Sequence, residues 1–310
     1  MNTFKERLYP DHGQYLAVAS VFCACRTDYQ DVLVFENPTF GKVLVLDGIV
    51  QLTERDSHVY HEMIAHVPMI AHGDARDVLI IGGGDGGTLR EVIKHPIDSV
   101  TLVELDPKVI EISQQYLPGI SGGAFADPRL SVVLGDGARY IAEAGRRFDV
   151  IIVDSTDPIG PAQALFTDPF YAACRMALRE TGVISLQSGC PFYQTAHVTR
   201  ALSRLRDRFG AAGAYLAPVP TYANGLLALM IAGLEDHLIP ALEVLRSRVE
   251  MIGLDTEYYS PVVHHAAFAM PPRFARNYDD DQSEERFARP LPDWIGRPIR
   301  RRTLASRTSR

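Results

Sequence analysis

The sequence has few cysteines and lacks both a long apolar run and a signal-peptide core. Its four cysteines, Cys23, Cys25, Cys174 and Cys190, are too few and too scattered for a disulfide framework. No apolar run approaches the roughly 20 residues that a membrane span needs. The first residues show no apolar core of the kind that a signal peptide carries. We therefore expect a reduced, cytoplasmic protein with no membrane partner.

The charge is also modest for a chain of this length. A formal net charge of -7 over 310 residues and a pI near 5.8 argue against nucleic acid as the main partner and fit a cationic substrate. With 46% hydrophobic and 22% charged residues, the composition is that of an ordinary globular protein. The length allows one large α/β domain and a smaller one, and we find no internal repeat.

The first 55 residues have the pattern of a small domain of β-hairpins. Residues 15–35 alternate between apolar and polar side chains, with turn residues at 26–28. Residues 42–52 alternate around Asp47-Gly48, a strong hairpin signal. Residues 57–71 then carry an apolar stripe at helical spacing, formed by Val59, Met63, Ile64 and Val67.

From residue 77 onward, strand and helix patterns alternate. Short aliphatic runs predict strands at 77–81, 99–103, 130–134, 148–153, 182–187, 213–217 and 226–232. Amphipathic segments predict helices at 86–95, 107–116, 137–143, 168–178, 194–208 and 238–249. The alternation predicts an α/β domain over residues 56–275, a doubly wound Rossmann-like sheet of the class I methyltransferase kind. Residues 276–310, rich in Pro and Arg, are expected to form a loosely ordered extension, with a basic partner-binding tail as the alternative.

The glycine-rich stretch after the first of these strands is the strongest functional signal. Gly82, Gly84 and Gly87 lie between a β-branched run and a helical pattern, the geometry that places a nucleotide at a helix N-terminus. Glu104 ends the next strand, where an acid can bind ribose hydroxyls. We therefore predict a nucleoside-binding site, with a purely structural turn as the alternative.

Asp85 separates this turn from the dinucleotide-binding turn of a dehydrogenase. The glycine spacing fits the dinucleotide fingerprint literally, but an aspartate inside the turn would repel a pyrophosphate. A carboxylate there favours a cation. Together with Asp154 and Asp157 it predicts an acidic cluster in one crevice, suited to an amine-bearing ligand.

Two further strands end in acids at the same predicted edge. The strand 148–153 is followed by Asp154-Ser155-Thr156-Asp157, on a loop stiffened by Pro158 and Pro161. In an open α/β sheet, ligands bind beyond the carboxyl ends of the strands. Helix capping is the alternative role for one of these acids, and less easily for both. Asp136, before Gly137, is placed to accept a hydrogen bond from an adenine amino group, to cap a helix, or to do both.

The histidines of the helix 57–71 raise the possibility of a metal site. The zinc helix motif needs histidines four residues apart, whereas His61 and His66 are five apart and face away from each other. We therefore predict no metal ligand. Tyr60 and His61 are predicted to line the pocket, with core packing as the alternative.

At this point the sequence resembles the spermidine synthases, a family of polyamine aminopropyltransferases. The resemblance runs from about Gln14 to Met270. The matching blocks are Thr27-Asp-Tyr-Gln-Asp31, Leu46-Asp-Gly-Ile-Val-Gln51, Thr53-Glu-Arg-Asp56, Tyr60-His-Glu-Met63, Gly82-Gly-Gly-Asp-Gly86, Glu104-Leu-Asp106, Gly135-Asp-Gly137, Asp154-Ser-Thr-Asp-Pro158 and Pro220-Thr-Tyr222. The glycine and aspartate blocks are together highly specific, and the Arg-rich tail lies outside the resemblance.

The resemblance implies transfer of an aminopropyl group from decarboxylated S-adenosylmethionine, a co-substrate rather than a cofactor, to putrescine. The products would be spermidine and methylthioadenosine. By motif position, Glu104 would hold the ribose, Asp136 with Gly137 the adenine, and Asp85 the aminopropyl ammonium. The rest of the pocket, closed by the loop through Pro161, would be shaped by Gln30, Gln51, Tyr60, His61, Tyr222 and the segment Asp154, Ser155, Thr156, Asp157. The family commonly pairs through its N-terminal region, so we expect a homodimer or homotetramer.

The chemistry supports a division of roles between two aspartates. A primary alkylamine resembles lysine, with a pKa of about 10.4, so it arrives protonated and cannot attack. A carboxylate must take that proton while another holds the far ammonium. We assign proton acceptance to Asp154 and amine binding to Asp157, although the sequence does not firmly order the two.

Two departures from the family pattern put the choice of acceptor in question. They are Ser57-His58, and Tyr222-Ala-Asn-Gly225 followed by Leu226-Leu227. The competing functions are an S-adenosylmethionine-dependent amine N-methyltransferase and a catalytically silent regulatory subunit. Asp85 argues against the first, and the complete set of acids argues against the second.

Overall fold

The computed structural model describes residues 2–145, 147–158, 160–234 and 238–274. The expected extension at 276–310 lies outside these residues. No helix in the described ranges combines the length and the hydropathy needed to cross a membrane.

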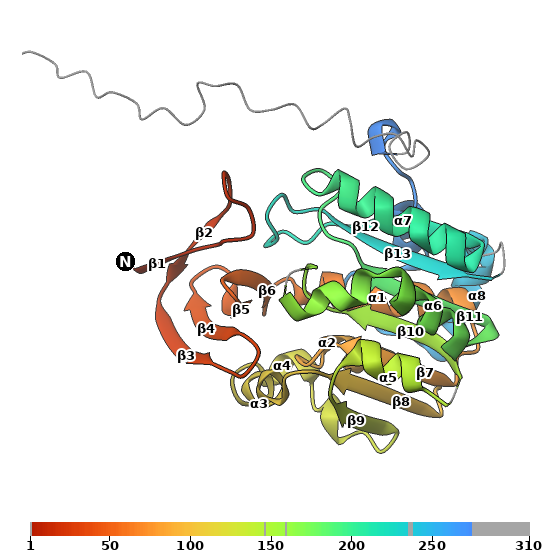
Figure 1. Ribbon diagram of the computed structural model, residues 1–310, viewed down its shortest axis with the longest axis horizontal. Coiled ribbons are helices and arrows are strands. Elements are labelled where there is room, and N and C mark those ends of the chain that lie inside the picture. The colour runs from red at the N-terminus through yellow and green to blue at the C-terminus, as the bar shows by residue number, and fades with distance from the viewer. Residues whose placement is uncertain (1, 146, 159, 235–237, 275–310) are drawn as a thin grey trace, which may run out of the picture.

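Two small antiparallel sheets form the N-terminal part, at one end of the molecule (Figure 1). Strand β1 (Asn2–Lys5) pairs with β2 (Tyr15–Val18). The second sheet is a meander of four strands, β3 (Ser20–Arg26), β4 (Asp31–Asn37), β5 (Gly41–Leu46) and β6 (Ile49–Thr53). Asp47 and Gly48 both have positive φ, 49° and 79°, which suits the predicted two-residue hairpin between β5 and β6.

Over the described ranges, the large sheet has seven strands in the order β12-β13-β11-β10-β7-β8-β9. All of them run parallel except β13, which is antiparallel to both its neighbours. This confirms the predicted Rossmann-like architecture, while the reversal of β13 is a detail that the strand pattern did not reveal. The strands are β7 (Asp77–Gly82), β8 (Ser99–Glu104), β9 (Leu130–Leu134), β10 (Phe148–Asp154), β11 (Leu178–Gln187), β12 (Ala211–Ala217) and β13 (Leu227–Gly233).

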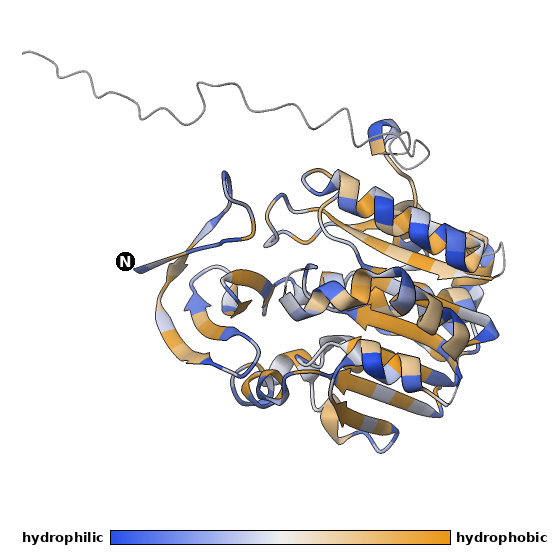
Figure 2. Ribbon diagram, in the orientation of Figure 1, coloured by the Kyte–Doolittle hydropathy of each residue, from blue (hydrophilic) through white to orange (hydrophobic). Residues whose placement is uncertain are grey.

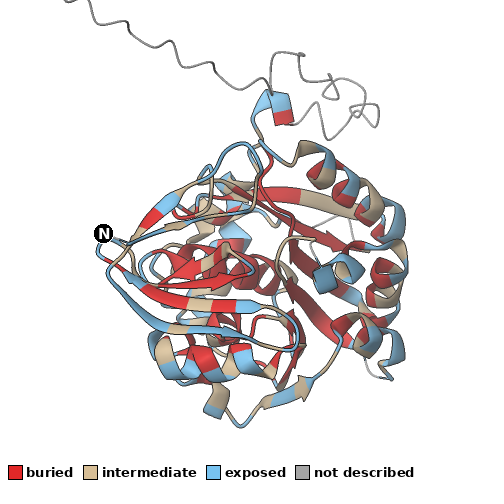
Figure 3. Ribbon diagram, turned by 60° about the vertical axis from the view of Figure 1, so that its left-hand side comes forward, coloured by how far each residue is buried: buried red, intermediate tan, exposed pale blue. Residues whose placement is uncertain are grey.

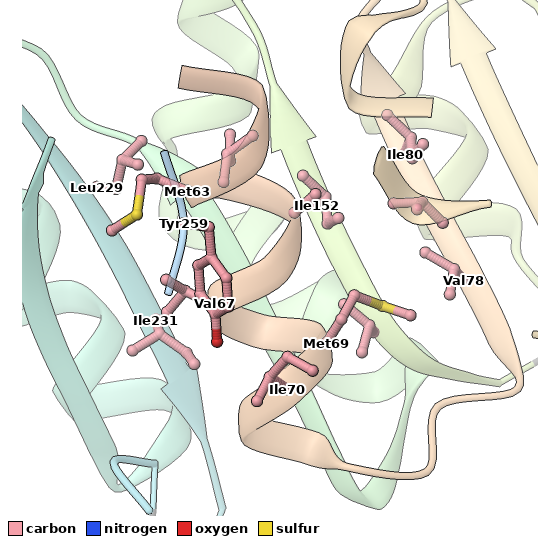
Figure 4. Packing of buried hydrophobic residues seen from close by; sticks show 14 of the residues in the cluster. Met63, Val67, Met69, Ile70, Val78, Ile80, Ile152, Leu229, Ile231 and Tyr259 are labelled. Carbon is pink, nitrogen blue, oxygen red and sulfur yellow. The ribbon is translucent and has the colours of Figure 1, made fainter. Parts of the chain in front are cut away.

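Helices cover both faces of this sheet because its strands are apolar on both sides. Val78 and Ile80 of β7 pack on one face with α1, α2 and α8, whereas Leu79 and Ile81 pack on the other with α5, α6 and α7. Figure 2 shows the hydrophobic strands between these layers, and Figure 4 shows the first cluster around α1. The helices are α1 (Ser57–His72), α2 (Gly87–Val92), α3 (Pro107–Tyr116), α4 (Pro118–Ser121), α5 (Gly137–Glu143), α6 (Asp168–Ala177), α7 (Thr195–Phe209), α8 (Leu242–Ile252) and α9 (Pro261–Ala267).

Several elements differ from the predicted ranges. Helix α2 is shorter than the predicted 86–95, and α8 begins at Leu242 rather than at residue 238. Strand β11 begins at Leu178, which pairs with Phe148 across an irregularity in the ladder. The polar residues 179–181 conceal that start in the sequence. The short helices α4 and α9 were not predicted.

The four-stranded sheet is held against the large domain by an apolar seam. Val32, Val34 and Leu44 pack against Val109 and Ile112 of α3. A second link is polar, because Asp56, buried before α1, accepts hydrogen bonds from the Thr221 backbone N–H and hydroxyl at 2.8 and 2.6 Å. Figure 3 shows the small sheet in front of the buried strands of the large one. The N-terminal part is therefore placed to form one wall of a site.

Candidate active site

A cavity of about 430 Å³ lies beyond the carboxyl ends of β7, β8, β9 and β10 and is walled by the N-terminal part. Every residue predicted for the site lines it. From the large domain these are Gly82, Gly84, Asp85, Glu104, Asp136, Gly137, Asp154, Ser155, Thr156, Asp157, Pro161 and Tyr222, with Tyr60 and His61 from α1 and Gln30 and Gln51 from the N-terminal part.

The glycine turn and the acidic loop are in direct backbone contact. Gly82 pairs with Asp154 across β7 and β10, and the Gly83 N–H donates to the Asp154 carbonyl oxygen at 2.9 Å. A Cβ added at Gly82 would lie 2.0 Å from that oxygen, and its φ of 84° also favours glycine. The close approach therefore requires glycine, and it brings the two predicted motifs together.

Asp85 and His61 form a pair at one side of the cavity, in which His61 is buried and Asp85 is partly exposed. His61 Nε2 lies 3.1 Å from Asp85 Oδ1, and the Gly87 N–H donates to the same oxygen at 2.7 Å. Burial alone would raise the pKa of Asp85, but His61 and the Gly87 N–H outweigh it and the pKa is lowered. Burial alone would lower the pKa of His61, but Asp85 outweighs it and raises that pKa. Asp85 therefore stays ionised, as binding of a cation requires.

Asp154 ends β10 with both carboxylate oxygens occupied. The Tyr60 hydroxyl donates to Oδ1 at 2.7 Å and the Thr88 hydroxyl donates to Oδ2 at 2.6 Å. The residue is only 9% exposed. Burial, followed by the charge of Asp85, raises the pKa of Asp154 despite these two donors. A fixed carboxylate with a raised pKa is suited to accepting a proton near neutral pH.

Asp157 lies further out, on the loop after β10. Gln194 Nε2 donates to its Oδ1 at 3.3 Å, and burial raises its pKa. Glu6 lines the same cavity and is fixed by the Val50 N–H and by Gln14, each at 3.1 Å. Burial raises the pKa of Glu6 too, with a smaller contribution from Asp157. This part of the cavity thus offers carboxyl groups beyond Asp154.

Glu104 and Asp136 lie at the ends of the next two strands. Glu104 is 8% exposed and accepts the Asp106 N–H at 2.9 Å. Burial raises its pKa to about 7. Asp136 caps α5 by accepting the Ala138 N–H at 2.8 Å, so its capping role is present beside its place in the cavity wall.

The remaining predicted polar residues form the walls through bonds within the protein. Gln30 Nε2 donates to Asp106 at 2.9 Å, and the Tyr222 hydroxyl donates to the Gln51 carbonyl at 2.8 Å. The rings of Tyr60 and Tyr222 meet edge to face with centroids 6.3 Å apart. Because these groups already have partners, they shape the cavity without needing a ligand to position them.

The two histidines of α1 occupy separate environments. His66 lies outside the cavity and contacts His95 and Glu91 at 2.9 and 3.0 Å. His61, Asp85 and Asp154 offer one ligand atom each within 4.8 Å of one another, a spacing that suits a metal ion as well as an ammonium group. The predicted separation of the histidines is therefore seen, but the spacing argument did not consider this second grouping.

Several residues that line the cavity or hold its side chains in place were missed from the sequence. Gln187 ends β11, so the rule that ligands bind beyond the carboxyl ends of the strands would have found it, as it found Asp136. Thr88 follows the glycine turn directly, but its bond to Asp154 spans 66 positions of sequence and has no local signal. The same holds for the other missed residues, which include Glu6, Tyr9, Cys190 and Gln194.

The chain matches two family models that together cover most of the described residues. Residues 57–239 match the spermine/spermidine synthase domain, and residues 3–54 match the spermidine synthase tetramerisation domain. Among curated proteins, the polyamine aminopropyltransferase of Ruegeria sp. (strain TM1040) is 48% identical over 271 residues, covering 86% of this chain and 94% of that protein. Polyamine aminopropyltransferase 1 of Pseudomonas aeruginosa is 45% identical over 274 residues, covering 87% and 96%.

Solved structures agree with this. A crystal structure of spermidine synthase in complex with the transition-state analogue AdoDATO superposes with a TM-score of 0.85 at 39% identity, covering 90% of this chain and 95% of that one. Spermidine synthase from Thermotoga maritima gives a TM-score of 0.83 at 37% identity, covering 90% and 94%. The fold, the cavity and both family matches lead to one conclusion: the chain belongs to the spermine/spermidine synthase family.

Proposed function

We propose that the chain is a spermidine synthase, which transfers an aminopropyl group from decarboxylated S-adenosylmethionine to putrescine. The products are spermidine and methylthioadenosine. The names of the relatives support this proposal, and the observation that carries it is the ionised Asp85 inside the glycine turn, next to the buried Asp154. A carboxylate at that point attracts a donor with a terminal ammonium and repels one with a carboxylate.

The donor is proposed to lie across the carboxyl ends of β7, β8 and β9. Glu104 accepts hydrogen bonds from the ribose hydroxyls, and Asp136 with Gly137 binds the adenine edge. Asp85 binds the aminopropyl ammonium. In this proposed arrangement, the aminopropyl carbon that is bonded to the sulfonium lies close to Asp154.

The acceptor is proposed to enter on the side of Asp157, where Glu6 adds a further carboxyl group. One amine is anchored there as an ammonium. The other loses its proton to Asp154 and attacks the donor carbon in line, while the carbon–sulfur bond breaks and methylthioadenosine leaves as a neutral thioether. The sulfonium needs no acid to leave, so positioning of two cations and removal of one proton are the enzyme's main tasks.

The reaction is proposed to need no cofactor or metal. Within the grouping of His61, Asp85 and Asp154 that suits a metal ion, we assign Asp85 to the donor ammonium and Asp154 to the proton of the acceptor amine. A homo-oligomer is also proposed, because the N-terminal residues match the tetramerisation domain and Tyr15, Val21 and Phe22 are exposed on β2 and β3.

One assay tests the proposal. The protein, dialysed against a chelator, is incubated with S-adenosylmethionine or its decarboxylated form and with a panel of amines, and the products are identified by mass. Spermidine and methylthioadenosine from the decarboxylated donor and putrescine are expected. A methylated amine from the intact donor would replace the proposal with a methyltransferase, and loss of activity restored by a divalent metal would refute the metal-free mechanism.

A further inference from the structure

Two of the four cysteines lie side by side outside the cavity. Cys23 and Cys25 are on β3, and their Sγ atoms are 3.6 Å apart. Both are free thiols; Cys25 is exposed and Cys23 is partly buried. Cys174 and Cys190, in contrast, are buried in the large domain. The pair is therefore the accessible dithiol of the described chain.

The strand geometry places both thiols on one face of the small sheet. Residues two apart on a strand point the same way, and Cys23 and Cys25 pair with Val34 and Val32 of β4 in regular register. Two steps of a strand span about 6.6 Å between Cα atoms, near the upper end of the range that a disulfide bridges. Because the sulfurs are 3.6 Å apart and a disulfide needs about 2.05 Å, β3 must bend to bring them to bonding distance.

The surroundings give the two thiols different exposure. Cys23 packs against the apolar seam between the small sheet and α3. Burial there disfavours the thiolate and raises the pKa of Cys23 to about 11. Cys25 is exposed, and the ammonium of Lys108 from α3 is close enough to interact with it electrostatically. Cys25 is thus the thiol that a solvent oxidant meets first, and Cys23 is the neighbour beside it.

We propose that Cys23 and Cys25 form a redox modification site that a peroxide converts into an intramolecular disulfide. The Cys25 thiolate attacks one peroxide oxygen, the O–O bond breaks, and hydroxide departs as the leaving group. Cys25 is now a sulfenic acid. The Cys23 thiol then attacks that sulfur, the S–S bond forms, and water leaves. Two thiols are oxidised and one peroxide is reduced to two waters. A disulfide in a bent strand is strained and easily reduced, as in cytosolic redox sensors.

The site is connected to the cavity by a short chain of hydrogen bonds. Strand β3 ends at Arg26, and the next residue, Thr27, donates to Asp106 at 2.7 Å. Gln30, from the same turn, also donates to Asp106, at 2.9 Å. The Asp106 N–H in turn binds Glu104 at 2.9 Å. Bending β3 at Cys25 therefore displaces the turn that holds Glu104 in position, and nucleoside binding weakens. This consequence rests on the proposed function.

The test uses the full chain in its native assembly. After treatment with hydrogen peroxide, remaining thiols are blocked with iodoacetamide, and the peptide containing residues 23–25 is weighed. We expect that peptide to be lighter than its reduced form by two hydrogens and to carry no label. Reduction with dithiothreitol before blocking should make both cysteines available to iodoacetamide again. Binding of methylthioadenosine, measured by calorimetry, is expected to weaken about tenfold on oxidation, the effect of losing one hydrogen bond at the pocket.

Cys23→Ser and Cys25→Ser are matched controls, because each leaves one thiol that cannot form the bond. Both are expected to keep methylthioadenosine affinity after peroxide. The site is refuted if the peptide carries two labels or if the disulfide joins two chains. Loss of affinity in both controls would assign the effect to Cys190 in the cavity instead. A disulfide with unchanged affinity would refute the link to the cavity. The mass measurement needs no enzymatic activity, so its failure is distinct from a failure of the proposed function.

Discussion

His61 and Asp85 are joined at one side of the cavity by a contact of 3.1 Å between Nε2 and Oδ1. One comes from α1 and the other from the turn between β7 and α2, so two separate elements converge on one charge. His61 Nδ1 is buried and has no hydrogen-bond partner among the residues that the structure describes. By contacting Oδ1, the histidine fixes Asp85 in place, and Oδ2 is the oxygen to which we assign the ligand.

The first prediction concerns selection of the donor by Asp85. Asp85→Asn removes the negative charge but keeps the shape, and it should weaken binding of the decarboxylated donor by about 1.5–3 kcal/mol, the scale of a hydrogen bond to a charged group. Binding of intact S-adenosylmethionine should change far less. Calorimetry with both donors measures this, with Asp207→Asn on the exposed side of α7 as a matched control. Equal affinity of the wild-type protein for the two donors would contradict it.

The second prediction concerns the cost of burying Glu104. Its pKa is raised from 4.5 to about 7 by burial, so the folded protein binds a proton there that the unfolded chain releases. The associated stability is complete below pH 4.5 and is lost as the pH rises through 7. Glu104→Gln removes this dependence, so relative to wild type it should gain about 2–3 kcal/mol in free energy of unfolding between pH 5 and pH 8.

Urea denaturation of both proteins at the two pH values measures that gain. The same variant should bind methylthioadenosine more weakly, because a neutral amide is a weaker acceptor for ribose hydroxyls. A stability difference that does not vary with pH would show that Glu104 is already ionised in the free protein.

These residues also show how far the sequence alone could lead. Asp85, Glu104, Asp136 and Asp154 each follow or end a strand, so their shared edge was predictable from the strand pattern. The Thr88 hydroxyl on Asp154 was not, because no local pattern specifies which side chain from another element will meet an acid. The N-terminal wall with Glu6 was equally hidden, since its position depends on packing between sheets rather than on periodicity.

A third prediction concerns assembly through the N-terminal sheets. Tyr15 and Val21 are 76% and 55% exposed on strands β2 and β3, which is unfavourable for large apolar side chains in water. We expect light scattering at micromolar concentration to give a mass of two or four chains rather than the 34.3 kDa of one. Val21→Lys should shift the protein toward smaller species. A monomer in the wild type would rule out this assembly.

The fourth prediction concerns acid sensitivity of the buried histidines outside the cavity. His95 faces His66, Glu91 and Lys94, and burial followed by the charge of His66 lowers its pKa to about 3. Below pH 6.5, His95 binds a proton in the unfolded chain but stays neutral in the folded protein. The free energy of unfolding therefore falls as the pH falls from 6.5 toward 3. From His95 alone, the free energy of unfolding should drop by about 2 kcal/mol between pH 7 and pH 5. Denaturation of His95→Gln should show a smaller drop, and an equal drop would place the titration elsewhere.

The last prediction separates the roles of Asp154 and Asp157. Asp154→Asn can keep its bonds to Tyr60 and Thr88, because an amide oxygen accepts and an amide nitrogen donates to a hydroxyl. We therefore expect a folded variant that binds the donor but loses about 10²–10⁴-fold in kcat, the usual contribution of a general base.

Raising the pH should partly restore the Asp154→Asn variant, because free putrescine then arrives without a proton to remove. In the described part of the chain, the Asp157 carboxylate has one hydrogen bond, a long one from Gln194 at 3.3 Å. Asp157 also lies on the loop rather than on β10, so it is better suited to anchoring than to proton transfer. Asp157→Asn should raise the putrescine KM more than it lowers kcat. Profiles of kcat against pH for the wild type and both variants decide between the two. If Asp157→Asn shows the turnover defect that high pH restores, and Asp154→Asn changes only KM, the two assignments must be exchanged.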